Sequence, residues 1–226
     1  MIINSFEYDG TKLPFKNNVC VLVGENGCGK SYALNMFQTY LSDYRSAVAR
    51  KYAKLKPETL VAELPKPAYY QATNYNSIAV PTESSFTDGQ AKAICDTFNK
   101  VYKDADQQLG HSAFGFSIHL NGYTRKRLGR DLLRESDMSA GQRHLFNMLL
   151  SIYARSDSPT GVFVILDEPE ASLDIEKQRR LLPAIKEITF VKGILVATQS
   201  PFIFDNDLDT SATVGMGMCA TEKETT

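Results

Sequence analysis

Residues 19–31, VCVLVGENGCGKS, decide how the rest of this chain is interpreted. The stretch starts with a short apolar run, Val19 to Val23, that is rich in β-branched residues and is followed at once by a glycine. This combination predicts a buried strand that enters a tight turn, and a helix-forming run follows directly. Between the two lies Gly-x-x-x-x-Gly-Lys-Ser, the phosphate-loop pattern, in the strand, loop and helix context that it requires.

The residues of this loop are suited to hold phosphate. Glycines let the backbone turn successive N–H groups toward an anion, and the helix beginning near Lys30 adds its positive end. Lys30 is expected to reach the β- and γ-phosphates of a nucleotide, and the Ser31 hydroxyl to take one coordination position of Mg²⁺. An incidental glycine turn before a helix is the alternative. The predicted nucleotide-binding residues are Gly24, Glu25, Asn26, Gly27, Cys28, Gly29, Lys30 and Ser31.

Length and composition indicate a globular protein. The chain has 226 residues, of which 43% are hydrophobic and 23% charged, enough for one large α/β domain or two small ones. Its net charge of −1 gives no overall attraction to nucleic acid or anionic membrane, so DNA contact would need a local patch. No leader or long apolar segment is present, which predicts a protein that neither enters the membrane nor is secreted by the usual route.

The four cysteines are far apart in the sequence and form no metal-binding or disulfide pattern. This usage fits a reducing, cytoplasmic environment.

Hydrophobic periodicity predicts an α/β fold, a mostly parallel sheet flanked by helices, with an N-terminal antiparallel hairpin in residues 1–16 and an inserted lobe. The Phe6 or Tyr8 ring of the hairpin either packs in the core or stacks on an adenine. Helices are expected at 30–56, 89–102, 140–154 and 175–188, and strands at 68–71, 113–123, 161–166 and 193–197.

Three regions follow from this pattern. Residues 1–75 and 138–206 are expected to form the core lobe, 76–137 an inserted lobe, and 207–226 a mobile tail. The inserted lobe ends in a basic run that is either a solvated loop or a patch for phosphate backbone or an acidic partner. Its cations are Arg125, Lys126, Arg127, Arg130 and Arg134.

Polar side chains collect at predicted strand ends. Gln71, Asp167 and Gln199 each follow an apolar strand, and ligands bind at such ends in open α/β sheets. Asp167 is expected to hold Mg²⁺, together with Ser31 and Gln71, and Glu168 to orient an attacking water. The alternative for the acidic pair is capping of the next helix.

Several motifs then resemble those of ABC-type ATPases. Met138-Ser139-Ala140-Gly141-Gln142 looks like their signature sequence, Leu166-Asp167-Glu168-Pro169 like their second nucleotide motif, and Ala171-Ser172-Leu173-Asp174 like the loop after it. Gln71 is placed like the glutamine that senses metal and water, and Thr198-Gln199-Ser200-Pro201 aligns with the switch loop.

The resemblance implies a mechanism. In such ATPases two heads enclose two ATP molecules with Mg²⁺, and each phosphate loop faces the signature sequence of the other head. Ser139, Gly141 and Gln142 would then contact the nucleotide of a second copy, together with Asp174, and hydrolysis at Glu168 would release the dimer. Ser139 is equally suited to be an ordinary helix N-cap, with Gln142 completing a capping box.

One position departs from the family pattern. Most members carry a histidine where this chain has Gln199, and an amide hydrogen-bonds a phosphate but cannot carry a positive charge. Slow hydrolysis is therefore expected, with Lys30, Glu168 and Gln199 as the catalytic set.

Three functions remain open. The resemblance favours the soluble heads of the SMC, recombination-mediator and OLD-like group, many of which act in DNA repair or anti-phage defence. The chain has no room for a long coiled-coil arm or a nuclease module, so a separate effector protein is expected, and DNA is a possible ligand. The alternatives are the ATP-binding subunit of a membrane transporter and a scaffold that binds ATP without hydrolysing it.

Overall fold

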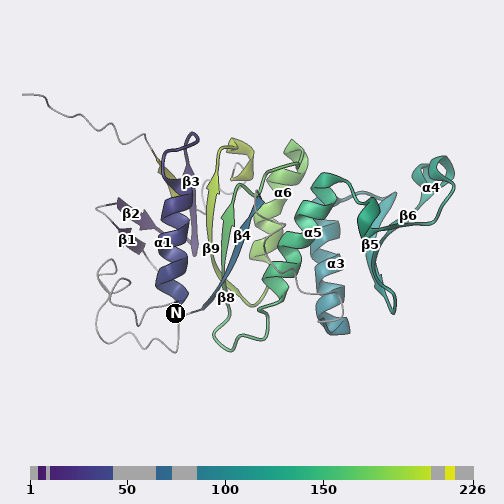
Figure 1. Ribbon diagram of the computed structural model, residues 1–226, viewed down its shortest axis with the longest axis horizontal. Helices are drawn as coiled ribbons and strands as arrows, with labels where there is room; N and C mark the ends of the chain where they lie inside the picture. The colour runs from purple at the N-terminus through teal and green to yellow at the C-terminus, as the bar shows by residue number, and fades with distance from the viewer. Residues whose placement is uncertain (1–4, 9–10, 43–64, 73–85, 205–211, 217–226) are drawn as a thin grey trace, which may run out of the picture.

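A five-stranded sheet forms the centre of the molecule (Figure 1). The computed structural model describes residues 5–8, 11–42, 65–72, 86–204 and 212–216. Along the sheet the strand order is β10-β3-β9-β8-β4, and every neighbouring pair is parallel, as predicted. The strands are β3 (Val19–Val23), β4 (Lys66–Gln71), β8 (Val162–Asp167), β9 (Val191–Thr198) and β10 (Ala212–Gly215).

The two faces of the sheet bury alternate residues in two cores. Leu22, Ile165 and Leu195 face the helix α1 (Lys30–Ser42), whereas Val21, Val164 and Val196 face the helices α5 (Ala140–Tyr153) and α6 (Ile175–Lys186). Because successive strand residues point to opposite faces, a continuous apolar strand is required for a sheet covered on both sides. This explains the unbroken apolar runs in the sequence.

The predicted N-terminal hairpin is present, with β1 (Ser5–Tyr8) antiparallel to β2 (Thr11–Pro14). Phe6 is 3% exposed, and its ring lies 5.1 Å from that of Phe37 and 5.3 Å from that of Tyr40. Phe6 is therefore a core residue and is not free to stack on a nucleotide base. The Tyr8 side chain lies outside the described residues.

The inserted lobe consists of the helix α3 (Asp88–Tyr102) and a small antiparallel sheet of order β5-β6-β7. In Figure 1 this sheet lies beside α3, on the side away from the central sheet. Its strands are β5 (Gln107–Ser112), β6 (Gly115–Leu120) and β7 (Leu132–Arg134). The strand expected at 113–123 corresponds to β6 and the first residues of the helix α4 (Gly122–Leu128). A 3-10 turn, η4 (Glu135–Asp137), precedes α5.

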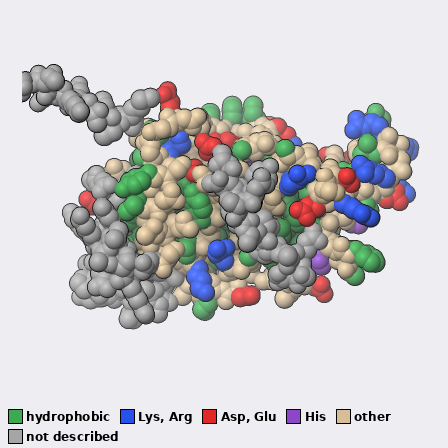
Figure 2. Space-filling model, viewed as in Figure 1, with side chains coloured by type: hydrophobic (Ala, Val, Ile, Leu, Met, Phe, Trp, Pro, Cys, Tyr) green, Lys and Arg blue, Asp and Glu red, His purple; other side chains and the backbone are tan. Residues whose placement is uncertain are grey.

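The expectation of a loop for the basic run was wrong for its first half. Residues 122–128 form α4, which buries none of its side chains and ends at Gly129 in the left-handed conformation. Figure 2 shows Lys and Arg side chains gathered at this projecting end of the molecule. Arg125, Lys126 and Arg127 are therefore exposed on a helix, whereas Arg130 lies between α4 and β7, and Arg134 ends β7.

The expectation of a tail at 207–226 was also wrong in one part. Ala212–Gly215 is the edge strand β10, which pairs with β3 beside the phosphate loop. Residues 207–211 and 217–226, and residues 43–56 of the expected long helix, lie outside the described residues.

Candidate functional site

The loop between β3 and α1 has the backbone that the phosphate-loop pattern predicts. Gly27 and Gly29 have φ angles of 80° and 94°, a region that other residues rarely adopt. At Gly24 a Cβ atom would lie 2.5 Å from the Met216 carbonyl oxygen and 2.7 Å from Cys28 Sγ. Glycine is therefore required at 24 by close packing against the end of β10, which the motif alone does not reveal.

Lys30 closes this loop on itself. Its ammonium donates to the carbonyl oxygens of Gly24 at 2.7 Å and Glu25 at 2.9 Å, and the residue is only 5% exposed. These bonds hold the charge inside the curve of the loop, where a phosphate group would meet it. The arrangement is consistent with an anion-binding cradle built from backbone N–H groups and one buried cation.

Asp167 lies at the end of β8, next to Gln71 in the neighbouring strand β4. Asp167 is 1% exposed, its Oδ2 accepts from the Tyr69 hydroxyl at 3.4 Å, and its Oδ1 is buried with no hydrogen-bond partner in the described part of the chain. Burial raises the pKa of this carboxyl, as does the charge of Glu168, whereas the Ser31 hydroxyl and Lys30 lower it.

This set of residues fits Mg²⁺. An unpartnered buried carboxylate oxygen needs an explanation, and a cation would satisfy it. Among the described residues no three His, Cys, Asp or Glu side chains group closely enough to cage a metal. Mg²⁺ does not need such a cage, because it usually takes one or two protein oxygens together with water and phosphate oxygens.

Glu168 and Gln199 face each other across the ends of β8 and β9. The Gln199 side-chain amide donates to Glu168 Oε1 at 2.9 Å and to Asn26 Oδ1 at 2.6 Å. Glu168 itself has a φ of 52°, and its N–H donates to the Ala197 carbonyl at 2.9 Å. One amide therefore connects three segments that sequence reasoning assigned to the site: the phosphate loop, the second nucleotide motif and the switch loop.

Glu170 is a further residue of this site, whose role was not predicted. Its Oε1 accepts from Thr198 Oγ1 at 2.6 Å and from the backbone N–H groups of Gln199 at 2.9 Å and Ser200 at 3.3 Å. No sequence pattern indicates which segment a loop carboxylate will bind.

The signature turn, residues 138–142, is partly exposed and partly buried. Ser139 is exposed and caps α5, and it forms the predicted capping box with Gln142. Gln142 is 4% exposed, and its amide also donates to Gln107 Oε1 at 3.0 Å. Its side chain is therefore bonded within its own chain.

Gly141 is buried for a reason that the motif does not show. A Cβ atom at this position would lie 2.3 Å from the Ser172 carbonyl oxygen and 3.0 Å from the Tyr102 hydroxyl. The start of α5 thus packs directly on the loop that follows the second nucleotide motif.

Asp174 ends that loop as the N-cap of α6. Its carboxylate accepts from the Lys177 N–H at 3.0 Å and pairs with the Lys177 ammonium. The hydrogen bond and charge of Lys177 lower the pKa of Asp174. The side chain is exposed, so it remains accessible from outside.

His144 connects the signature helix to the two strands that carry site residues. Its Nδ1 lies 3.0 Å from the Tyr70 hydroxyl and its Nε2 lies 3.0 Å from the Pro169 carbonyl oxygen. Burial lowers the pKa of His144. A neutral ring donates from Nε2 to Pro169 and accepts at Nδ1 from the Tyr70 hydroxyl, whose one proton also lies within reach of the His144 carbonyl oxygen at 3.1 Å.

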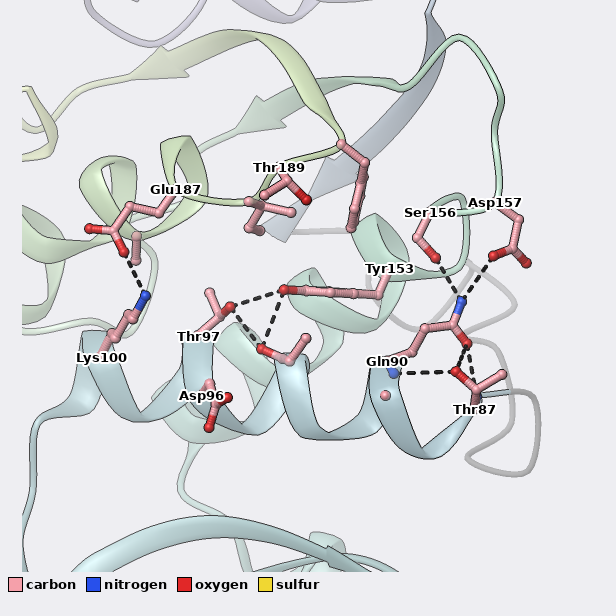
Figure 3. A pocket seen from close by; sticks show the side chains of 15 residues that line it. Thr87, Gln90, Asp96, Thr97, Lys100, Tyr153, Ser156, Asp157, Glu187 and Thr189 are labelled. Atoms are coloured by element: carbon pink, nitrogen blue, oxygen red, sulfur yellow. Dashed lines mark hydrogen bonds and ion pairs between the residues drawn. The ribbon is translucent and has the colours of Figure 1, made fainter.

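A polar cavity of about 490 Å³ lies elsewhere, where α3 meets the ends of α5 and α6 (Figure 3). Its lining holds α3 to the core by three bridges: Lys100 to Glu187 at 2.5 Å, Thr97 to Tyr153 at 3.1 Å, and Gln90 to Ser156 at 2.7 Å. None of the sequence-predicted site residues lines it. The cavity therefore lies at the junction of α3 with the core, and it is not the nucleotide site.

None of the helices in the described ranges has the length and apolar character that a membrane span needs.

Comparisons with known proteins agree with the fold. The family described as "AAA domain, putative AbiEii toxin, Type IV TA system" matches residues 73–205, and no curated protein matches the sequence. The fold is similar to the SMC head domain from Thermotoga maritima, with a TM-score of 0.63 and 14% identity over 95% of this chain and 94% of that one. It is also similar to an SMC head solved bound to the C-winged helix domain of ScpA, with a TM-score of 0.58, 15% identity and the same two coverages. The predicted fold, that of a P-loop ATPase head of the SMC type, is thereby confirmed.

Proposed function

Because this chain belongs to the family described as "AAA domain, putative AbiEii toxin, Type IV TA system", we propose that it is an ATPase that dimerises on ATP and so controls a partner protein or acts on DNA. The observation that carries the proposal is the bond of 2.9 Å between Gln199 and Glu168, beside the buried Asp167. This places the proposed base Glu168, the proposed phosphate-contacting amide of Gln199 and the proposed metal ligand Asp167 together at the sheet edge next to the phosphate loop.

ATP would bind at residues 24–31. The buried Lys30 would exchange its carbonyl partners for the β- and γ-phosphates, and the backbone N–H groups of the loop would surround them. Ser31, Gln71 and Asp167 would hold Mg²⁺, which when bound neutralises charge that develops on the phosphates.

Glu168 would orient and deprotonate the attacking water. It is half-buried and at present accepts from Gln199, so this amide must move toward the γ-phosphate before the carboxylate is free. Hydrolysis is expected to be slow, because the switch position supplies a neutral amide where an imidazolium would stabilise the transition state more strongly.

A second copy would complete the site from the exposed Ser139 and the N-terminus of α5. Figure 1 shows the start of α5 and the phosphate loop at the same edge of the molecule, on different sides of the sheet. This separation suits a head-to-tail pair, in which each signature turn meets the other copy's loop. Since the Gln142 side chain is bonded internally, its contribution would come from the backbone.

The partner is proposed to be a separate protein in the cytoplasm, with a role in anti-phage defence or DNA repair. The family description, with its putative toxin and its toxin–antitoxin system, supports defence. One of the structurally similar heads was solved bound to a domain of another protein, which supports a partner chain. A transporter subunit is the less favoured alternative.

DNA is a second candidate ligand, because of α4. Arg125, Lys126 and Arg127 follow one another on a helix with no buried side chain, and the Arg127 guanidinium lies 5.9 Å from the centre of the Tyr123 ring. Asp131 pairs with Arg125, whereas no carboxylate of the described residues pairs with Lys126 or Arg127. Two exposed, unpaired cations beside an exposed aromatic ring suit phosphate backbone.

The proposal is tested with Glu168→Gln. The variant is expected to bind ATP, to elute as a dimer with ATP and Mg²⁺, and to lose turnover by about a hundredfold or more, since ground-state binding is kept and water activation is lost. Lys30→Ala should lose nucleotide binding, and Lys92→Gln, on the exposed face of α3, should behave as wild type. A wild-type chain that neither hydrolyses ATP nor dimerises with it would refute the proposal.

DNA is tested by adding duplex DNA to the ATPase assay. Stimulation that disappears when Lys126 and Arg127 are both changed to Gln supports α4 as the contact. Unchanged turnover with DNA in both proteins would exclude this ligand and leave the partner protein.

A further inference from the structure

The carboxylate of Glu170 binds the backbone of the switch loop directly. One oxygen, Oε1, accepts from the Gln199 N–H at 2.9 Å and from the Ser200 N–H at 3.3 Å. It also accepts from the Thr198 hydroxyl at 2.6 Å. Glu170 belongs to the turn after β8 and the other three residues to the end of β9, so this contact joins two strand ends that both carry site residues.

The switch loop is held from a second side by α6. The Ser200 hydroxyl donates to Gln178 Oε1 at 2.6 Å, and the Gln178 amide donates to the Leu173 carbonyl at 2.7 Å. The Ser200 N–H additionally donates to Thr198 Oγ1 at 2.9 Å. The backbone on both sides of Gln199 is thereby fixed, while its side chain is exposed and bonds toward Asn26 and Glu168.

From this arrangement we infer that Glu170 is a positioning residue for ATP hydrolysis, which acts by fixing the peptide from which the Gln199 amide reaches Glu168 and the γ-phosphate. The inference rests on the proposed function. A side chain can move between Glu168 and a phosphate only as far as its backbone anchor allows, and misplacement of a catalytic amide by about 1 Å can lower a rate by about a hundredfold.

A charged acceptor suits this task better than a neutral one. Hydrogen bonds to a carboxylate are roughly twice as strong as those between neutral groups, so three of them on one oxygen hold the loop firmly. The other oxygen, Oε2, is buried without a partner among the described residues. An unpaired buried polar atom costs stability, and the wild type already carries one at this position. Glu170→Gln replaces it with an equally unpaired NH₂ group, so the variant is expected to fold.

The test uses Glu170→Ala and Glu170→Gln, each alone and combined with Gln199→Ala. Glu170→Ala is expected to lower kcat about tenfold with KM changed less than about threefold, because the transition state is affected and not ground-state binding. Glu170→Gln should recover part of this loss, since its amide oxygen still accepts from the two N–H groups. Lys92→Ala, on the exposed face of α3, serves as the surface control.

The double variant separates positioning from a general weakening of the fold. If Glu170 acts through Gln199, then adding Glu170→Ala to Gln199→Ala lowers kcat by less than about twofold, because the residue it positions is already absent. If the two losses multiply, Glu170 acts independently of Gln199 and the inference is overturned.

Hydrogen exchange gives a readout that does not depend on turnover. In Glu170→Ala the Gln199 and Ser200 amides should exchange at least about tenfold faster, while amides within β8 keep their protection. Unchanged exchange at Gln199 would overturn the inference. A wild-type chain without ATP turnover would refute the proposed function and the positioning role with it, whereas an active wild type with multiplying losses refutes only the positioning role.

Discussion

The side-chain amide of Gln199 donates a hydrogen bond of 2.9 Å to Oε1 of Glu168, and the same nitrogen lies 2.6 Å from Asn26 Oδ1. In this structure the proposed base is therefore engaged by the proposed γ-phosphate sensor. An incoming phosphate would compete for this amide and release the carboxylate. If the proposed function holds, such an arrangement would couple nucleotide binding to the availability of the base.

Gln199→His tests how much the neutral amide limits the rate. An imidazole at this position can become positively charged beside the γ-phosphate, and stabilisation of that kind is worth about tenfold or more in rate. We expect a higher kcat in the variant, with the gain larger at pH 6 than at pH 8 because the ring is protonated at the lower pH. Steady-state ATPase assays over this range measure it, with Glu168→Gln/Gln199→His as the inactive control. Equal rates in the variant and wild type would show that charge at position 199 is not limiting.

Asp167→Asn should separate stability from function. Asp167 is 1% exposed with one oxygen unpartnered among the described residues, so its charge is costly when no cation is bound beside it. Removing the charge is expected to raise the Tm without ligand by about 2–4 °C, the shift for about 1 kcal/mol in a chain of this size. The extra stabilisation that ATP and Mg²⁺ give the wild type should disappear. Thermal melts with and without Mg-ATP decide this, and a variant that is still stabilised by Mg-ATP as strongly as wild type would exclude Asp167 as a metal ligand.

His144 is expected to make stability depend on pH. Burial lowers its pKa below the ordinary 6.5, so below that pH the unfolded chain binds a proton that the folded chain does not. The stabilisation contributed by neutral His144 is therefore complete above about pH 6.5 and is lost as pH falls toward its lowered folded value. In urea unfolding, the free energy of unfolding should decrease between pH 7 and pH 5.5, and this decrease should be smaller in His144→Gln.

The control for this prediction is His119→Gln, which changes an exposed ring on β6. It should keep the full decrease between pH 7 and pH 5.5. If His144→Gln loses stability over this range as steeply as wild type, groups other than His144 determine the acid sensitivity.

The sequence predicted the elements whose signals are local. The phosphate loop, the apolar strand before Asp167 and the capping box of Ser139 were all correct, because each is set by residues within a few positions of one another. β10 was missed since four residues with only one large apolar side chain become a strand by pairing with β3, about 190 positions earlier. β5 was missed for a similar reason, because in QQLGHS only Leu109 is buried.

The same contrast between signals from neighbouring residues and contacts between distant residues holds for the site. Motif spacing was sufficient to select the residues at the strand ends, and the structure places Asn26, Glu168 and Gln199 in contact. It was not sufficient for Glu170 or His144, whose bonds cross 25 or more positions to partners that only the folded chain brings near. The reasons for glycine at positions 24 and 141 are likewise contacts with distant backbone.

Gly141→Ala is expected to disturb the signature turn, and Gly89→Ala provides a matched control, since each glycine is the second residue of its helix. At Gly141 the new Cβ would lie 2.3 Å from the Ser172 carbonyl oxygen, which is backbone and cannot rotate away. At Gly89 the nearest atom, Thr87 Oγ1, is 4.0 Å from the new Cβ. Alanine also favours a helix over glycine by up to about 1 kcal/mol. Gly89→Ala should therefore be neutral or stabilising, whereas Gly141→Ala should destabilise by about 1–3 kcal/mol because of overpacking.

Urea unfolding compares the two variants, and equal changes in the free energy of unfolding would mean that α5 and the 171–174 loop separate at little cost.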